Sequence, residues 1–132
     1  MTTPNPTPNS THDPVLEIVA RLLIPESGVR FVLDVLVTAS QMKFKATGHS
    51  EPLDVELICS AFDTYAREYF NDPQEAIELL EEWEIFTSDQ LGEVVEAIAG
   101  MGKMKLIPGQ TPESLGASFE GRFSVRGMFK AQ

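Results

Sequence analysis

Side chains that could carry out chemistry are few in this chain. It has two histidines, His12 and His49, and a single cysteine, Cys59. One cysteine excludes an internal disulfide and a cysteine-cluster metal site, and two histidines would have to share a zinc ion with carboxylates. The sequence also lacks a phosphate-binding loop, a dinucleotide fingerprint and a nucleophile elbow. We therefore expect no metal, no cofactor and no enzymatic activity.

His49 is the residue with the most suggestive setting. It lies in a Gly-His-Ser-Glu-Pro loop before a predicted helix, where an imidazole could act as a general base or as a pH-sensitive contact. A small enzyme that uses His49 stays an alternative, although a surface loop residue is the favoured interpretation. Cys59 lies among apolar residues with no histidine nearby in the sequence, which favours a small buried side chain over a nucleophile.

Acidic residues gather in the middle of the chain. Residues 51–100 hold fourteen carboxylates and one base, Arg67, in a chain whose net charge is −10. This charge repels phosphate backbones, so it argues against nucleic acid. Trp83 lies on the most acidic predicted helix and is favoured as a core residue, but an aromatic side chain there would also suit a basic peptide. We predict a non-catalytic interaction domain with a basic protein partner, bound through Glu78, Glu81, Glu82, Trp83 and Glu93.

The C-terminal part has the opposite charge. Residues 101–132 hold two acids and five bases. This segment could lie against the acidic middle of its own fold, which we favour, or bind an acidic partner. An alternative function is a nucleic-acid-binding regulator that uses these bases: Lys103, Lys105, Arg122, Arg126 and Lys130.

Length and composition predict one globular domain. The chain has 132 residues, of which 42% are hydrophobic and 23% charged. Residues 1–12 are rich in Pro, Thr and Asn and predict a disordered tail, and residues 13–132 predict a single domain. No apolar run is long enough to span a membrane, and no secretory signal pattern is present, so we expect a cytoplasmic protein. The sequence sets no oligomeric state.

Helical spacing of apolar residues predicts five helices, and the fold class is mainly α. Asp72-Pro73 and the Thr87–Gln90 pair are the clearest helix starts. Residues 29–42 are rich in β-branched side chains and could instead form a buried strand, although a stripe of helical period favours a helix. The five predicted ranges are 13–24, 27–45, 53–70, 73–84 and 88–101.

After the fifth helix the apolar period changes to two. This alternation predicts a short C-terminal β-hairpin from residues 103–107 and 119–126, with one helical turn between them that ends at Leu115. Three helices followed by two strands resemble a winged helix, with residues 108–118 as the wing. The helix that would enter DNA carries Asp89, Glu93 and Glu96 and no base before Lys103, which again favours protein recognition.

Three short segments resemble an uncharacterised bacterial family associated with planctomycetes and verrucomicrobia. They are Leu80-Glu81-Glu82-Trp83-Glu84-Ile85, Gly92-Glu93-Val94-Val95 and Phe119-Glu120-Gly121-Arg122-Phe123. The resemblance covers about residues 13–125 and departs at 101–107, where the family has a more apolar segment. It implies one folded unit and brings no known activity or catalytic residue.

Overall fold

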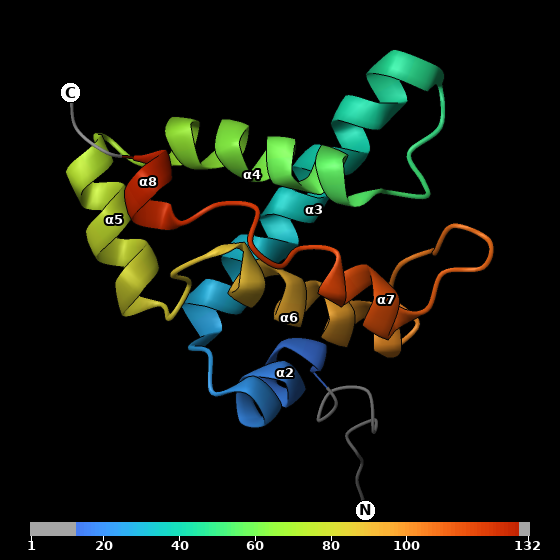
Figure 1. Ribbon diagram of the computed structural model, residues 1–132, viewed down its shortest axis with the longest axis horizontal. Helices are drawn as coiled ribbons and strands as arrows, with labels where there is room; N and C mark the ends of the chain where they lie inside the picture. The colour runs from blue at the N-terminus through green and yellow to red at the C-terminus, as the bar shows by residue number, and fades with distance from the viewer. Residues whose placement is uncertain (1–12, 130–132) are drawn as a thin grey trace, which may run out of the picture.

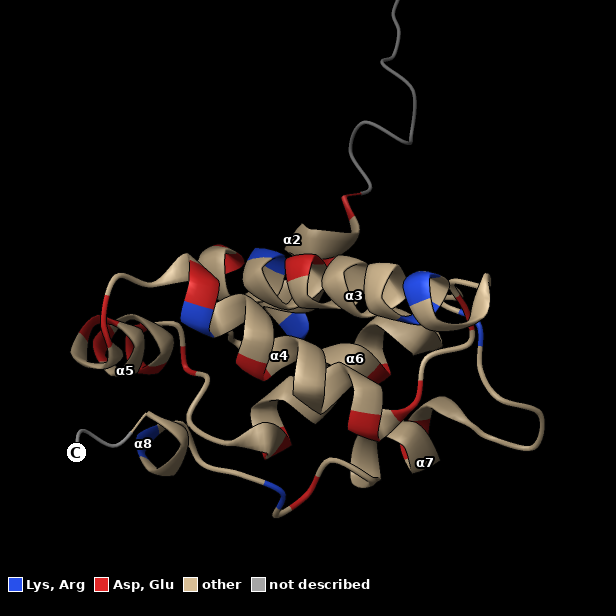
Figure 2. Cartoon of the chain, turned by 90° about the horizontal axis from the view of Figure 1, so that it is seen from above, with Lys and Arg blue, Asp and Glu red and all other residues tan. Residues whose placement is uncertain are grey.

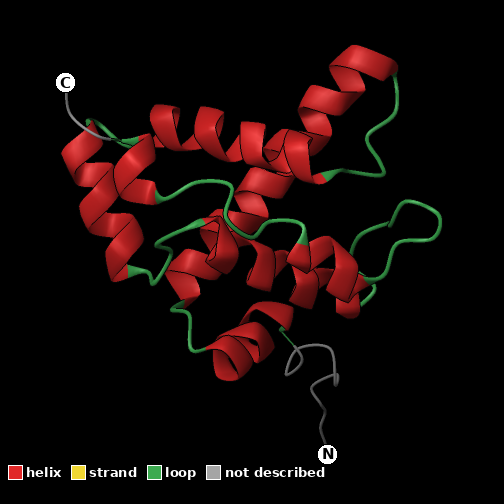
Figure 3. Ribbon diagram, viewed as in Figure 1, coloured by secondary structure: helices red, strands yellow, loops and turns green. Residues whose placement is uncertain are grey.

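The computed structural model describes residues 13–129, and within this range all regular secondary structure is helical (Figures 1 and 3). The predicted tail at residues 1–12 lies outside the described range. The mainly helical fold class is confirmed. The described helices are α2 (Pro14–Leu22), α3 (Glu26–Thr47), α4 (Val55–Tyr69), α5 (Pro73–Glu82), α6 (Ser88–Gly100), α7 (Pro112–Ala117) and α8 (Val125–Met128).

Polar side chains begin most of these helices. Asp72 accepts a hydrogen bond from the Glu75 N–H at 2.8 Å, and Pro73 occupies the first turn of α5. Thr87 and Gln90 form the predicted capping box of α6. α4 begins at Val55, two residues after the predicted start at residue 53, and the Asp54 carboxylate caps it by accepting from the Leu57 N–H at 2.8 Å.

α3 settles the choice between helix and strand for residues 29–42. It runs for 22 residues, about 33 Å at the usual helical rise, and is the longest described helix. Gly48 ends it in the left-handed region, with φ +84° and its N–H donating to the Phe44 carbonyl oxygen at 2.8 Å. The last turns of α3 extend beyond the neighbouring helices, at the upper right of Figure 1.

α6 is the centre of the core. It contacts α2, α3 and α7, and eight of its thirteen residues are buried. Gly92 permits a close approach of the segment that contains α7, because a Cβ at this position would lie 2.7 Å from both the Gly116 carbonyl oxygen and the Phe119 Cβ. The residues of α6 that stay exposed or partly exposed are Asp89, Gln90, Glu93, Glu96 and Gly100, and they include no base. α6 is therefore a core helix whose outer face is acidic, which does not suit a DNA groove.

The predicted C-terminal hairpin does not form. Residues 103–107 are a loop, and the described segment that follows holds two short helices, α7 and α8. The described part of the chain therefore has two short helices beyond the predicted five and lacks the wing of a winged helix. One isolated bridge, between Thr87 and Ser124, is the β-type pairing seen there. The alternation of Phe119, Phe123 and Val125 has another cause, since Phe119 and Val125 reach the core from the ends of two different helices.

No helix within residues 13–129 combines the length and the apolar character needed to cross a lipid bilayer.

Candidate functional site

The predicted acidic surface begins on α5. Glu78 is exposed and accepts a hydrogen bond from Gln74 Nε2 at 2.9 Å, and Glu82 is exposed as well. Glu81 is only partly exposed and forms a two-point ion pair with Arg126 of α8, at 2.6 and 2.9 Å. One of the three α5 glutamates in the predicted surface is therefore neutralised by the basic C-terminal part, as the favoured intramolecular interpretation predicted.

Trp83 belongs to an aromatic cluster between three helices. Its ring centroid lies 5.7 Å from that of Phe31 and 6.0 Å from that of Phe70. The Trp83 backbone and Cβ also contact α3 at Gly28, where an added Cβ would lie 2.9 Å from the Trp83 carbonyl oxygen. These contacts assign Trp83 mainly to the packing between α3, α4 and α5.

Glu93 lies apart from the α5 glutamates. It lines a small hollow of about 180 Å³ between α2, α6 and the start of α7, together with Arg21, Glu96 and Glu113. The predicted surface is thus divided between two regions that face different neighbours. Within residues 13–129 no group of His, Cys, Asp and Glu side chains is arranged to hold a metal ion.

His49 and Cys59 do not meet. His49 is exposed in the loop after α3, where its backbone N–H and carbonyl oxygen both bond to the Thr47 hydroxyl at 3.1 Å. Cys59 is half-buried on α4, and this burial raises the pKa of its thiol, while the charge of Arg122 opposes the shift. A raised pKa reduces the thiolate fraction and makes Cys59 a weak nucleophile.

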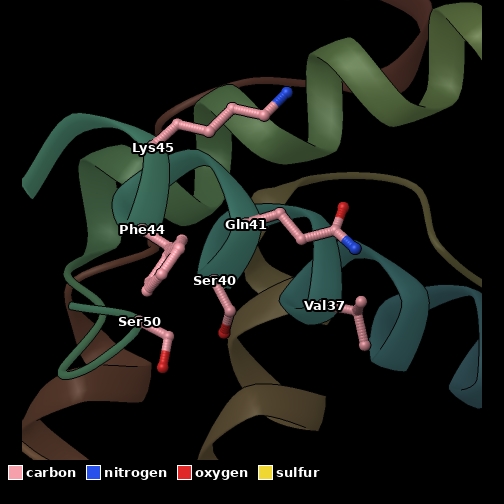
Figure 4. Close-up of a pocket in the computed structure, with 6 residues that line it drawn as sticks. All are labelled: Val37, Ser40, Gln41, Phe44, Lys45 and Ser50. Carbon is pink, nitrogen blue, oxygen red and sulfur yellow. The ribbon is translucent and has the colours of Figure 1, made fainter. Parts of the chain in front are cut away.

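A larger hollow lies elsewhere, along the last turns of α3. It has a volume of about 630 Å³ and is open to solvent. Figure 4 shows the side chains of Val37, Ser40 and Phe44 pointing to the same side of α3, with Ser50 approaching from the following loop. Phe44 is 59% exposed and Val37 is 54% exposed, although both are apolar. The six lining residues are Val37, Ser40, Gln41, Phe44, Lys45 and Ser50.

A second hollow continues the first toward the core. It has a volume of about 240 Å³ and shares Val37 and Ser40 with the larger one. Its other lining residues come from α3, the loop after α3, α6 and the loop after α6: Leu33, Leu36, Glu51, Leu53, Ile98, Lys103 and Met104. We call the two hollows together the α3 groove. Its α3 residues recur at helical spacing and form an apolar stripe beside the buried one.

Two loops are fixed as walls of the α3 groove. The Lys43 ammonium donates to the Pro52 carbonyl oxygen, and Leu53 is buried, so both hold the loop that follows α3. The Glu51 carboxylate accepts a hydrogen bond from the Lys105 backbone N–H at 2.9 Å, which joins this loop to the loop after α6. The Glu51–Lys105 contact joins residues 54 positions apart, and the two contacts together give the groove a defined shape.

Sequence reasoning missed the α3 groove. A signal was present, because Leu33, Val37 and Phe44 follow each other at steps of four and seven, which places them on one helical face. They lie outside the stripe that predicted the core. The positions at which α4 and α6 cross α3 decide whether the core stripe or the stripe of Leu33, Val37 and Phe44 stays uncovered.

Comparisons of the chain with protein-family models, with curated proteins and with solved structures found no match. Membership of the bacterial family named above therefore stays a prediction, and the function has to be argued from the geometry of the site.

Proposed function

We propose that this chain is a non-catalytic protein-interaction domain that binds a segment of its partner in the α3 groove. The observation that carries this proposal is the exposure of Phe44 and Val37 at the mouth of a continuous apolar hollow. Single exposed apolar residues are ordinary on protein surfaces, but a contiguous apolar groove with polar edges is typical of an interaction site.

The composition of the groove favours a protein partner over a substrate. Enzyme sites combine an apolar pocket with convergent polar groups and shifted pKa values. The polar side chains in the larger hollow are Ser40, Gln41, Ser50 and Lys45, and none of them pairs with another described group as a nucleophile would with a base. An apolar stripe at helical spacing is instead the surface that an amphipathic helix recognises.

This proposal keeps the class of function that the sequence predicted and changes the surface. Three residues of the predicted acidic surface have other roles or places. Glu81 forms an ion pair, Trp83 packs in an aromatic cluster, and Glu93 lines a separate hollow. The exposed pair Glu78 and Glu82 remains a smaller candidate for a basic partner.

The nucleic-acid alternative receives no support from the arrangement of its bases. Arg126 pairs with Glu81 at the α5–α8 end of the molecule. Lys103 and Lys105 lie in the loop after α6, at the opposite end in Figure 2. Lys130 lies outside the described residues. A separated set of bases cannot follow one phosphate backbone.

Site-specific photo-crosslinking tests the proposal. The crosslinking amino acid p-benzoylphenylalanine would replace Phe44 in one variant and Leu23 in a control, because Leu23 is 80% exposed but lies at the end of α2. In the native cells we expect a discrete adduct from position 44 that position 23 does not give. Identical adduct patterns, or none at position 44, would contradict the proposal.

A further inference from the structure

Lysines surround the α3 groove. Lys45 lines the larger hollow and Lys103 lines the smaller one. Lys43 and Lys105 hold its two loops through Pro52 and Glu51. These are all the lysines within residues 13–129. Figure 2 shows basic segments at the end of α3 and in the loop after α6, at the same end of the molecule.

These lysines differ from the arginines in their pairing. Each salt bridge found within residues 13–129 uses an arginine: Arg30 with Asp13 and Glu26, Arg67 with Asp63, and Arg126 with Glu81. The four lysines take part in none of them. A chain of net charge −10 therefore keeps a local excess of positive charge beside its most exposed apolar stripe. The lining holds one carboxylate, Glu51, and its Oε1 already accepts from the Lys105 backbone.

We infer that the α3 groove binds an acidic amphipathic helix from another protein. This inference rests on the proposed function and adds the chemistry of the partner. Apolar side chains of the helix would cover Val37 and Phe44 and enter the hollow above Leu33 and Leu53. Its carboxylates would face Lys45 and Lys103 at the edges. Complementary charges at the rim of an interface increase the association rate and select the partner, while the apolar centre supplies most of the affinity.

A second copy of the chain fits this groove poorly. A symmetric dimer through α3 would bring the same lysines against each other, because both copies present the same surface. The acidic α5 of a second copy has no free apolar face, since Ala76 and Leu80 are fully buried in their own fold. A separate acidic protein meets neither obstacle.

An anionic membrane surface is also disfavoured by the shape. Leu33, Leu36 and Leu53 line a recessed hollow instead of a protruding edge. A flat lipid surface could reach Phe44 but not the recessed part, and the net charge of the whole chain opposes approach to anionic lipid. A helix can enter the hollow with its side chains.

Selection from a phage-displayed library of random linear peptides tests this inference on the full chain. The recovered peptides would be synthesised and titrated by fluorescence anisotropy against the wild type, Phe44→Gln, the double variant Lys45→Glu and Lys103→Glu, and the control Arg21→Glu. Arg21 is an exposed base on α2, outside the groove. Circular dichroism of each variant checks that it is folded.

We expect peptides rich in Leu, Phe or Trp at helical spacing with Asp and Glu between them. Their affinity should fall about tenfold or more in Phe44→Gln, about threefold or more in the double lysine variant, and stay unchanged in Arg21→Glu. Higher salt should weaken binding to the wild type.

The other outcomes separate the inference from the proposed function. Peptides that depend on Phe44 but are neutral or basic would overturn the acidic partner and leave the docking groove in place. Recovery of no peptide that depends on Phe44 would overturn both. Co-sedimentation with phosphatidylserine vesicles that Phe44→Gln abolishes would assign the groove to a lipid surface and overturn the inference.

Discussion

The hydroxyl group of Ser88 donates a hydrogen bond to the carbonyl oxygen of Phe119 at 2.6 Å. Its oxygen also accepts from the backbone N–H groups of Arg122, at 3.0 Å, and Phe123, at 3.2 Å. Ser88 is the first residue of α6 and is fully buried. One side chain thus fixes the turn between α7 and α8 against the corner between α5 and α6.

Replacing Ser88 by alanine should therefore destabilise the domain. The change leaves a buried carbonyl oxygen and two N–H groups without their partner, and each unsatisfied buried group costs about 1–3 kcal/mol. We expect a loss of about 2 kcal/mol or more in the free energy of unfolding, measured by urea denaturation. Ser60→Ala on the exposed face of α4 is the matched control and should change it by less than about 0.5 kcal/mol. Equal stability of the two variants would contradict this role of Ser88.

Gly92→Ala should destabilise the domain, because it forces α6 and α7 apart. The added methyl group would lie 2.7 Å from the Gly116 carbonyl oxygen, which belongs to the backbone and cannot move aside. Overpacking of this kind costs about 1–3 kcal/mol. Gly100→Ala is the control, because it lies in the same helix with nothing within 4 Å, and it should be neutral or stabilise by up to about 1 kcal/mol. Melting temperatures of both variants test the contrast, and a Gly92→Ala protein as stable as the wild type would refute it.

The starts of α5 and α6 were predictable from the sequence because they depend on local chemistry. Asp72 and Thr87 cap their helices through side chains only a few residues away, so the sequence contains all the partners. The C-terminal strands were predicted wrongly, because alternation alone does not reveal which neighbour buries each apolar residue. Phe119 and Val125 are both fully buried, yet a turn held by Ser88 separates them.

The α3 groove could not be predicted from the local sequence pattern. Val37 and Phe44 are apolar residues on a helix, and by type alone they are equivalent to Val35 and Phe31 of the same helix. Their exposure follows from the face of α3 on which they lie, which α4 and α6 leave uncovered, and the last turns of α3 also extend past the neighbouring helices (Figure 1). The paired state of Glu81 likewise required the position of α8. The kind of function proposed here could be predicted from composition, but the surface that carries it could not.

Ionisation of Tyr65 should lower the free energy of unfolding at alkaline pH. The burial of Tyr65 and then its hydrogen bond to Asp34, at 3.1 Å, raise its pKa from the ordinary value of 10.0 to about 12. The folded pKa lies above the unfolded one, so this contribution to stability is fully present below about pH 10 and is lost as the pH rises toward about 12. Tyr65→Phe keeps the ring and removes the ionisable group.

Denaturation curves across this pH range check the Tyr65 prediction. The variant should lose less stability between about pH 10 and pH 12 than the wild type does. An ultraviolet titration should also show the late phenolate transition disappearing in the variant. A wild type whose tyrosines all ionise together near the ordinary value of about 10 would contradict the raised pKa.

Phe44 should be dispensable for folding although it is a large aromatic residue. It is 59% exposed, and within residues 13–129 its ring makes no aromatic pair of the kind that joins Phe62 to Phe31 at 5.7 Å. Phe44→Gln keeps a good helix former and should change the free energy of unfolding by less than about 1 kcal/mol. Phe62→Ala, at a fully buried position, should cost about 3–5 kcal/mol. Urea denaturation of both variants measures the difference. A Phe44→Gln protein as unstable as Phe62→Ala would mean that the fold itself requires the aromatic ring, and the exposed stripe would then need no partner to explain it.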